Sequence, residues 1–287
     1  MKRCAFLTLE DEKDFVIDDK HAYQPMHDLG WHVSAVPWTQ TNTSWADFEV
    51  VVIRSTWDYP PRLTEFLQVL EHIDAQTLLA NPIELVHWNL SKTYLRDLES
   101  DGVGIVPTIW VDSLDADTLQ SAQKTLGKGG SVIKPVVGAN GQDAFLLSDS
   151  VGSERVEKLV NLFHQRPCMI QPFMGQVITE GEYSLFYFNG HFSHAILKTP
   201  TGAEFRSQEE HGATIKLTRP KALLMQRGFQ ALERVTPTPR YARIDFVRDK
   251  RNDFRVMEME LIEPSMYLRM HPDAPLRFAH AIDNWVQ

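Results

Sequence analysis

The sequence predicts an α/β protein with a small parallel sheet near its N-terminus and an α+β C-terminal lobe. Apolar, β-rich runs alternate with helical segments over residues 1–80, a pattern typical of parallel sheets. Beyond Gly175 the strands come in pairs joined by short turns, as in antiparallel hairpins. The 287 residues, 43% of them hydrophobic, allow one to three domains with buried cores.

The N-terminal elements follow from their hydrophobic patterns. Strands are expected at Met1–Leu9, Trp31–Trp38 and Glu49–Trp57, and helices at His21–Gly30 and Arg62–Ile73. Asn81-Pro82 and the polar segment after it interrupt this pattern. We therefore place a first domain at residues 1–90.

The middle of the chain begins with a serine that is a good helix cap. Ser91 precedes the helical segment Lys92–Ser100, which ends at Asp101-Gly102. Strands are then expected at Val103–Val111, Val132–Val136, Asp143–Leu147 and Cys168–Phe173, with helices at Asp115–Leu126 and Ser153–His164. These elements predict a second domain at residues 91–170.

The C-terminal part, residues 171–287, is predicted to contain two hairpins. The first has Asn189-Gly190 at its turn, a pair that suits type I′ geometry. The expected strands are Tyr183–Phe188, His191–Lys198, Tyr241–Asp249 and Asp253–Ile262, and the expected helices are Lys221–Val235 and Ala274–Val286.

Composition excludes several classes of partner. The formal net charge is −9 and the pI is about 5.7, so neither nucleic acid nor an anionic membrane surface is expected as a partner. The apolar runs are too short for a membrane span, and acids interrupt the N-terminal stretch too early for a secretory signal. Cys4 and Cys168 lie in apolar runs and are expected to be buried thiols. These features predict a cytoplasmic protein.

The second hairpin carries a concentration of charge. Its alternation places Ile244, Phe246, Met257, Met259 and Leu261 on one face. With a turn at Arg251-Asn252, Asp245 lies opposite Glu258, and Arg243 opposite Glu260. Three carboxylates on one patch repel each other unless a cation neutralises them. The patch is either a solvated strand face with a surface ion pair or a Mg²⁺ site.

A glycine-punctuated loop follows a strand-end lysine in VIKPVVGANGQDAFLL, residues 132–147. Taken alone, Lys134 and the loop Gly138-Ala139-Asn140-Gly141 fit an ordinary hairpin as well as a phosphate-binding loop. The order of features favours the second interpretation: a helix-start lysine, Lys92, comes first, then Lys134 and the loop, then an abruptly ending strand, and last the carboxylate hairpin.

That order resembles the ATP-grasp superfamily, and within it the prokaryotic glutathione synthetase-like and RimK-like ligases, from Lys92 to Ser265. The most specific match is YARID…MEMELIEPS, in which Asp245, Glu258, Glu260, Pro264 and Ser265 fall on family positions, although Glu260 stands where Asn is usual. EGEYSLFYFNG and FRSQEEHGA match two further segments, with departures at Ser184 and Ala213. VVIRSTWDY is similar to the branch that includes D-cycloserine synthetase.

The resemblance implies an ATP-grasp fold with a small lobe carrying the glycine loop and a large lobe carrying the metal site. It implies ATP and Mg²⁺ as cofactors, with two metal ions and Mn²⁺ as an alternative. The nucleotide-binding residues would be Lys92, Lys134, Gly138, Asn140, Gly141, Gln171, Pro172, Phe173, Met174 and Glu182, and the metal ligands would be Asp245, Glu258 and Glu260.

Two arginines are the expected catalytic residues. Arg206 would stabilise the transferring phosphoryl group, since a planar guanidinium suits phosphate. Arg243 would either reach the phosphates or hold Glu260, and the sequence favours neither. The implied reaction is an ADP-forming ligation, in which an amine or a thiol attacks an acyl phosphate. An ATP-grasp kinase and a nucleotide-binding protein without turnover are the alternatives.

The segment after the third strand is the expected substrate site. Arg54 would clamp a substrate carboxylate, with Ser55, Trp57 and Tyr59 beside it, because ligands bind beyond the carboxyl ends of parallel strands. The alternative is a loop that packs its aromatic residues at a domain interface. Weaker substrate-side candidates are Glu263, Ser265 and Arg269. His211 is either a proton carrier or a structural or solvated histidine. The expected partners are a small-molecule carboxylate and a nucleophile, with a homodimer as the default assembly.

Overall fold

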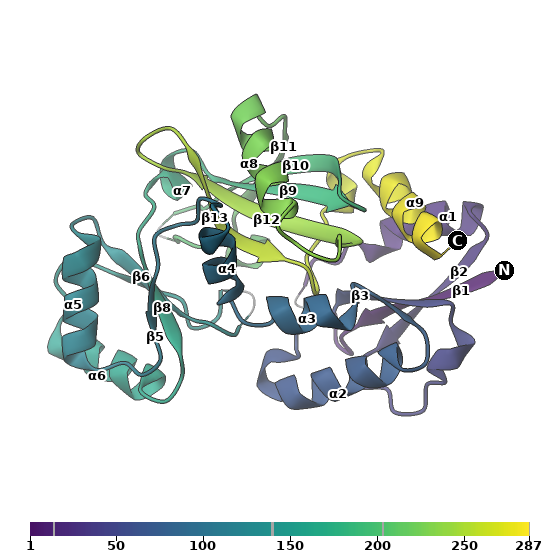
Figure 1. The fold of residues 1–287 in the computed structure, drawn as a ribbon, viewed down its shortest axis with the longest axis horizontal. Helices are drawn as coiled ribbons and strands as arrows, with labels where there is room; N and C mark the ends of the chain where they lie inside the picture. The colour runs from purple at the N-terminus through teal and green to yellow at the C-terminus, as the bar shows by residue number, and fades with distance from the viewer. Residues whose placement is uncertain (14, 139–140, 203, 287) are drawn as a thin grey trace.

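In this computed structural model, the described residues are 1–13, 15–138, 141–202 and 204–286. Over these ranges the chain forms three sheets with helices packed on their faces (Figure 1). The predicted α/β class with a parallel N-terminal sheet and antiparallel sheets beyond it is confirmed. None of the helices in these ranges is long and apolar enough to cross a membrane.

The N-terminal sheet is parallel, in the order β2-β1-β3-β4. Its strands are β1 (Lys2–Thr8), β2 (Trp31–Pro37), β3 (Val50–Ser55) and β4 (Leu78–Ala80). The alternation of strands and helices predicted the first three. It did not predict β4, which is too short to show a period.

Both faces of the N-terminal sheet are covered by helices. Leu7 and Ile53 pack with residues of α2 (Leu63–Asp74) and α3 (Ile83–Asn89). The opposite face packs on α1 (Tyr23–Asp28) and on the C-terminal helix α9 (Ala274–Val286). Burial on both faces explains the apolar runs of β1 and β3. Helix α3 occupies the segment expected to be a polar boundary.

The second sheet is antiparallel, in the order β5-β8-β6-β7. Its strands are β5 (Ile109–Val111), β6 (Ser131–Pro135), β7 (Phe145–Leu147) and β8 (Cys168–Pro172). The helices α5 (Ala116–Leu126) and α6 (Ser153–Phe163) share a core cluster with it. The strand expected at Val103–Val111 is shorter, because Ile105 pairs with Val256 of the third sheet instead.

Helix starts were predicted with mixed success. The Asp115 side chain accepts a hydrogen bond from Thr118 N at 2.7 Å and so caps α5. Ser91, in contrast, does not cap the next helix, because α4 (Tyr94–Ser100) begins three residues later. The Ser91 hydroxyl instead accepts from the Thr93 hydroxyl at 2.9 Å.

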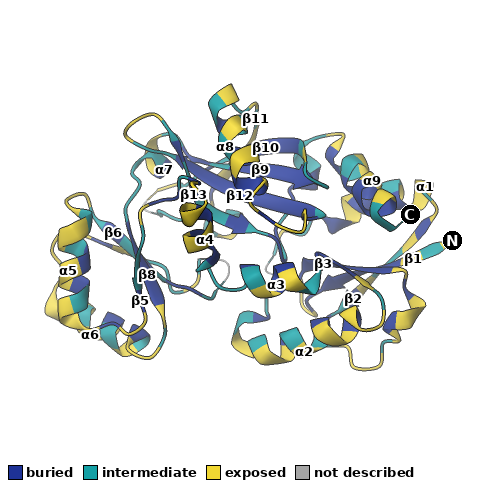
Figure 2. Cartoon of the chain, viewed as in Figure 1, coloured by how far each residue is buried: buried dark blue, intermediate teal, exposed yellow. Residues whose placement is uncertain are grey.

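The third sheet is antiparallel, in the order β11-β10-β9-β12-β13. Its strands are β9 (Glu182–Phe188), β10 (His191–Thr199), β11 (Thr214–Thr218), β12 (Tyr241–Arg248) and β13 (Phe254–Glu260). The short helix α7 (Gln176–Thr179) precedes it, while α4 and α8 (Ala222–Leu232) pack on it. Most of β9 and β12 is buried, as Figure 2 shows in dark blue. Positive φ values at Asn189 and Gly190 fit the predicted type I′ turn.

The β12–β13 hairpin has the predicted register where the charges lie. Asp245 pairs with Glu258, and Arg243 with Glu260. The turn is nevertheless one residue longer than expected, because Asp249 N donates to Asp253 O at 2.7 Å. A β-bulge beyond Asp245 compensates for the extra residue.

The bulge also changes which face Met257 joins. It packs with Val247 and lines a cavity, instead of sharing the face of Ile244 as predicted. The prediction for Met257 was therefore wrong, because simple alternation fails at a bulge.

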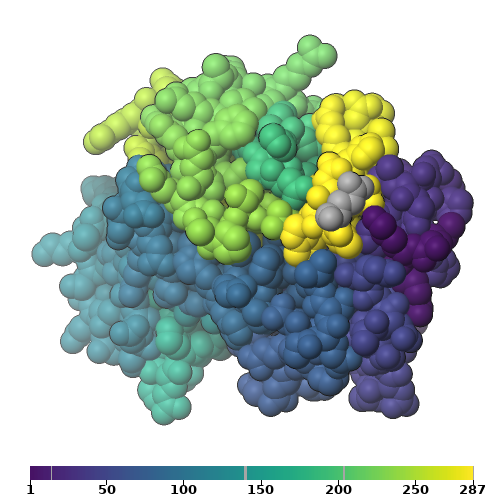
Figure 3. Space-filling model, turned by 45° about the vertical axis from the view of Figure 1, so that its right-hand side comes forward, coloured from purple at the N-terminus to yellow at the C-terminus, as the bar shows by residue number. Residues whose placement is uncertain are grey.

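Buried polar side chains connect the N-terminal sheet to the third sheet. Asn81, directly after β4, donates through Nδ2 to the carbonyl oxygens of Tyr241 at 2.9 Å and Leu261 at 2.8 Å. Its Oδ1 accepts from Arg240 N. Helix α9 lies between the two regions in the space-filling view, in yellow beside the purple N-terminal strands and the green central part (Figure 3).

Candidate active site

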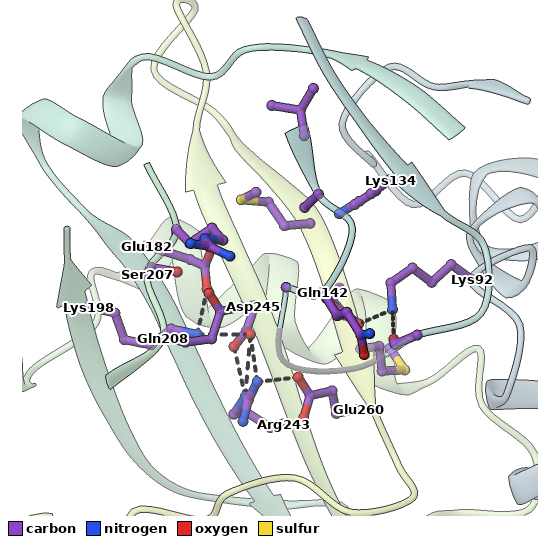
Figure 4. Close-up of a pocket in the computed structure, with 18 of the residues that line it drawn as sticks. Lys92, Lys134, Gln142, Glu182, Lys198, Ser207, Gln208, Arg243, Asp245 and Glu260 are labelled. Atoms are coloured by element: carbon purple, nitrogen blue, oxygen red, sulfur yellow. Dashed lines mark hydrogen bonds and ion pairs between the residues drawn. The ribbon is translucent and has the colours of Figure 1, made fainter. Parts of the chain in front are cut away.

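One cavity gathers side chains from the second and third sheets and from the loops near the N-terminal sheet (Figure 4). The predicted site residues that line it are Trp57, Tyr59, Lys92, Lys134, Gly138, Gly141, Gln171, Pro172, Phe173, Met174, Glu182, Arg206, Arg243, Asp245, Glu258, Glu260, Glu263 and Ser265. The structure therefore brings together residues separated by more than half of the chain. Asn140, also predicted, lies outside the described residues.

An apolar end of the cavity lies near the end of β8. Val106, Val177, Met257, Phe173 and Met174 line it. An apolar space of this kind suits an aromatic base. Two polar groups here already have partners: Gln171 Nε2 donates to Thr108 Oγ1 at 2.9 Å, and Phe173 N donates to Gly130 O at 3.0 Å. To hydrogen-bond to the edge of a base, the Gln171 amide and the Phe173 N–H would have to give up these partners.

Lys92 and Lys134 approach the cavity beside the glycine loop. Lys92 Nζ donates to Gly138 O at 2.9 Å and forms an ion pair with Glu258 at 2.6 Å. Lys134, on β6, forms no ion pair with any described residue, and burial lowers the pKa of its ammonium. It is thus a desolvated cation facing the cavity, which an anionic ligand would stabilise.

A buried lysine that the sequence analysis did not identify lies at the centre of the site. Lys198, on β10, lies 2.5 Å from Glu182 and 3.0 Å from Asp245, and its side chain is 3% exposed. Burial would lower the pKa of Lys198, but the charges of Asp245 and Glu182 outweigh it and raise that pKa above its usual value. The available signal was a lysine ending the apolar run AIL, the same pattern that singled out Lys134.

Arg243 neutralises two of the predicted metal ligands. Its guanidinium donates to Asp245 at 3.1 Å and to Glu260, and to the Ser265 carbonyl at 3.3 Å. Figure 4 shows Arg243 between the two carboxylates. Burial would raise the pKa of Asp245, but Arg243 and Lys198 outweigh it and hold that pKa below its usual value. In this structure Arg243 does hold Glu260, one of the two roles left open.

The three hairpin carboxylates differ in how well they are compensated. Burial would raise the pKa of Glu258, but Lys92 and Lys134 outweigh it and lower that pKa. Burial, with the repulsion of Glu258 and Asp245, raises the pKa of Glu260 to about 8 in spite of Arg243. Glu260 is therefore the least compensated of the three carboxylates, and a bound cation would favour its ionised form.

The donor set of this patch fits Mg²⁺. Asp245, Glu258 and Glu260 offer carboxylate oxygens from adjacent strands to one cavity, and hard oxygen ligands are those that Mg²⁺ prefers. Across the described ranges, no three acidic, histidine or cysteine side chains are already gathered in the manner of a metal site. Ligation by these three carboxylates therefore remains a prediction, and it would require Asp245 and Glu260 to share oxygens with Arg243 and Lys198.

The loop between β10 and β11 closes one side of the cavity. Arg206, Ser207 and Gln208 line the cavity from this loop. A Cβ atom at Gly141 would lie 3.0 Å from the Arg206 side chain and 3.4 Å from that of Gln208, so this loop touches the glycine loop. The Arg206 guanidinium pairs with Glu204 at 2.7 Å and would have to leave it to reach a phosphate.

The predicted substrate segment divides into two parts. Trp57 and Tyr59 line the cavity. Arg54 and Ser55 do not: the Arg54 side chain is 2% exposed and pairs with Asp19 at 2.9 Å, and Ser55 Oγ donates to Asp19 at 3.1 Å. A clamp role for Arg54 therefore has no support in this geometry, because its charge is already neutralised inside the protein.

The two weakest candidates also lie outside the cavity lining. Arg269 pairs with Asp18 at 2.8 Å and with Glu209 at 2.6 Å, so it connects three separate segments. His211 lies in the same loop as Glu209 and does not line the cavity in the described part of the chain.

Two family models match consecutive parts of this chain. The model described as "D-cycloserine synthetase DcsG, N-terminal domain" matches residues 4–81. The model described as "Prokaryotic glutathione synthetase, ATP-grasp domain" matches residues 104–238. Most of the residues that line the cavity lie within or directly beyond the second match.

Curated proteins and solved structures with similar sequences or folds include members of the same families. The "Cycloserine biosynthesis protein DcsG" of Streptomyces lavendulae is 31% identical over 269 residues, which cover 88% of this chain and 89% of the relative. The crystal structure of D-cycloserine synthetase DcsG matches with a TM-score of 0.86 at 27% identity, over 99% of this chain and 100% of that one. A RimK domain protein from Sphaerobacter thermophilus shares the fold, with a TM-score of 0.70 at 15% identity over 97% and 98% of the two chains.

Proposed function

This chain belongs to the ATP-grasp ligases of the glutathione synthetase type, and from that premise we propose that it joins a small amino-acid or peptide-like carboxylate to an amine or a thiol, forming ADP. Members of this family are ATP-dependent ligases, and so is this chain. The observation that carries the finer proposal is that one cavity holds Lys134, which forms no ion pair with a described residue, together with part of the glycine loop and the carboxylates of the β12–β13 hairpin.

In the first step, a carboxylate oxygen of the substrate attacks the γ-phosphorus of ATP, and the bond from that phosphorus to the β–γ bridging oxygen breaks. ADP leaves and an acyl phosphate remains on the substrate. Lys92 and Lys134 would hold the phosphates, since lysine ammonium groups bind phosphate as point charges. Arg206 would stabilise the transferring phosphoryl group after releasing Glu204, because phosphoryl transfer depends on positioning and charge.

Mg²⁺ would be held by Asp245, Glu258 and Glu260, and would neutralise charge on the β- and γ-phosphates. The protein's part is to keep Asp245 and Glu258 ionised before a metal ion binds. Lys198 contributes to that: its charge helps to hold the pKa of Asp245 low. Lys92 does the same for Glu258.

In the second step, an amine or a thiol attacks the acyl carbon, the bond to the phosphate oxygen breaks, and inorganic phosphate leaves while the nucleophile loses its proton. Carboxylate and nucleophile can belong to one molecule. D-cycloserine is cyclic, and a relative that matches most of this chain is a cycloserine biosynthesis protein. We therefore propose an intramolecular ligation as the first reaction to test.

The test is Mg²⁺-dependent ADP release across a panel of amino acids, dipeptides, and ureido- and aminooxy-amino acids, each with and without hydroxylamine. Hydroxylamine traps acyl phosphates as hydroxamates. ADP release together with a hydroxamate is the expected result. ADP with a stable phosphorylated product and no hydroxamate would instead indicate a kinase, and no ADP with any compound would contradict turnover of this substrate class.

A pair of variants connects the reaction to the cavity. Lys134→Met removes a buried cation of the cavity and is expected to reduce kcat/KM for ATP about 100-fold or more, as loss of a transition-state charge does. Lys128→Met removes an exposed lysine outside the cavity and is expected to leave the rate unchanged. Equal activity of the two variants would show that ATP turnover does not depend on the cation that Lys134 contributes to this cavity.

A further inference from the structure

Glu263 lies at the cavity's edge on a segment that is fixed from several sides. This segment, Leu261–Glu263, follows β13. Leu261 N donates to Asn89 Oδ1 at 2.8 Å, and Leu261 O accepts from Asn81 Nδ2 at 2.8 Å. Ile262 O lies 2.9 Å from the Tyr241 hydroxyl, and Glu263 O accepts from Trp57 Nε1 at 2.8 Å. The Glu263 carboxyl is therefore positioned before any ligand arrives.

Apart from Glu210, which is exposed, Glu263 differs from the other carboxylates that line this cavity in its charge partners. Asp245 and Glu182 pair with Lys198, Glu258 pairs with Lys92, and Glu260 pairs with Arg243. Among the described residues, Glu263 forms no salt bridge, and the group that hydrogen-bonds to its side chain is the neutral hydroxyl of Tyr59. Burial raises the pKa of Glu263 to about 7, as expected of a carboxyl without a cation.

The surroundings of Glu263 are aromatic. The Tyr59 ring stacks on Phe66 with centroids 4.3 Å apart, and Tyr59 is 5% exposed. The Trp57 ring contacts Phe15 at 5.2 Å. With Leu90 and Ile262, these rings give the carboxyl apolar walls. A cation that enters here loses its water and pairs with a carboxylate in a poorly solvated place, where the attraction is strong.

We propose that the Glu263 carboxylate, held by Tyr59, binds the cationic amine of the substrate and so selects for amino acids with a free amino group. This inference rests on the proposed ligase function and deepens it. The substrate carboxylate would point away from Glu263, toward the part of the same cavity where the γ-phosphate is proposed to bind. N-acylated and des-amino analogues would leave Glu263 without a cation and would bind weakly.

Matched substrate pairs test this selection. Each pair consists of an amino acid and its des-amino counterpart, for example D-alanine with propionate, and O-ureido-D-serine with 3-(ureidooxy)propionate. Hydroxamate formation gives kcat/KM for each compound, and calorimetry in the presence of Mg·ADP gives its affinity without turnover. The wild type is expected to prefer the amine-bearing member of a pair by about 10- to 100-fold, the range of a charged hydrogen bond.

Three variants assign the preference to Glu263. Glu263→Gln removes the charge and keeps the shape, and is expected to abolish the preference mainly through KM, with KM for ATP unchanged. Glu263→Asp keeps the charge and should restore part of the preference. Tyr59→Phe removes one hydroxyl group and should weaken the preference less than Glu263→Gln. Glu99→Gln, a charge change on the exposed side of α4, is the control and should behave as the wild type.

The two proposals fail in different ways. Equal affinity for both members of every pair in the wild type would overturn the role of Glu263, even if hydroxamates form and the ligase function stands. A preference that survives in Glu263→Gln would overturn it as well. No hydroxamate with any compound, while calorimetry shows amine-selective binding that Glu263→Gln removes, would support the role of Glu263 and contradict the ligase reaction.

Discussion

Lys198 illustrates how a single side chain can set the charge state of an active site. It neutralises Glu182 and Asp245 at once, and it is buried with them. Removing one member of such a group leaves an uncompensated buried charge, which costs far more than the pair contributes. The same argument explains why sequence reasoning can overlook such a lysine: its importance lies in partners contributed by two other strands.

We expect Lys198→Met to lower the free energy of unfolding by about 3 to 5 kcal/mol, because Glu182 and Asp245 would then repel each other in a buried place. Urea unfolding followed by circular dichroism measures the change. Lys216→Met, on the exposed side of the neighbouring strand β11, is the matched control and should change stability by less than about 0.5 kcal/mol. A similar, small effect of both variants would show that Lys198 does not compensate the two carboxylates.

His194 gives a pH-dependent prediction at the same scale. Burial lowers the pKa of its imidazole to about 3, and the ring stacks on Phe186 at 4.2 Å. Between pH 3 and 6.5 the unfolded chain therefore binds a proton at this residue that the folded protein does not, so His194 makes stability fall as pH falls. Relative to His194→Gln, the wild type should lose about 2 to 3 kcal/mol between pH 6.5 and 4.5.

The comparison with a variant is necessary because Glu260 and Glu263 act in the opposite direction. Their raised pKa values mean that the folded protein holds protons that the unfolded chain has released, so they stabilise the fold as pH falls toward 4.5. Both carboxyls are present in the wild type and in His194→Gln, and their contribution cancels in the difference. Parallel stability curves for the two proteins would contradict a neutral, buried His194.

Among single residues, the sequence indicated which side chains would meet in the cavity where they have a local signal, while the roles assigned to them stay predictions. Lys134 and Glu258 ended in the cavity because a lysine or a glutamate amid an apolar strand must find a charge partner or a ligand. Arg54 also lies in an apolar strand, but it found a charge partner instead of a place in the cavity. That partner, Asp19, belongs to a segment whose path the sequence does not reveal. The pattern shows that a charged residue is buried; it does not show what neutralises the charge.

At the scale of elements, the β12–β13 hairpin shows how a correct register can follow from an incorrect turn. The expected two-residue turn and the observed longer one differ by one position, and the bulge beyond Asp245 restores the pairing. Turn residues and alternation are local signals, so they predicted the strands and the charged face. The bulge depends on packing between Met257 and Val247, which lie on different strands.

The loop between β10 and β11 is tied to the rest of the molecule by Arg269. This residue pairs with Glu209 in the loop and with Asp18 beyond the N-terminal sheet. We expect Arg269→Met to raise the rate of amide hydrogen exchange in residues 204–213 by about 5- to 10-fold, because the loop would open more often. Arg269→Lys should restore part of the protection.

High salt should reduce the difference between Arg269→Met and the wild type, since the Arg269 side chain is 24% exposed and salt screens its charges. Arg62→Met, which loses a pair with Glu65 in the next helical turn, is the control and should leave exchange in residues 204–213 unchanged. Unchanged exchange in Arg269→Met would show that other contacts hold the loop.

For the whole molecule, Asn81 is the connection whose loss should matter most. Its side chain hydrogen-bonds to three backbone groups in or directly beside the strands of the third sheet: Arg240 N, Tyr241 O and Leu261 O. Asn81→Ala would leave these groups buried without partners, and we expect a loss of about 3 to 5 kcal/mol in the free energy of unfolding. Asn161→Ala, on the exposed face of α6, should cost less than about 0.5 kcal/mol in the same urea experiment. Equal effects would mean that the two sheets are not connected through Asn81.

Helix α9 has a consequence for how this protein is made. Phe278 and Ile282 of α9 share a core cluster with Phe6 and Val52, so one face of the first sheet is completed by a helix that is synthesised long after its strands. A ribosome adds about 5 to 20 residues per second, so roughly 10 to 40 seconds separate the completion of β4 from that of α9. Throughout that interval the nascent N-terminal sheet carries an apolar face that α1 covers only in part, and we expect the growing chain to need protection from aggregation most in this window.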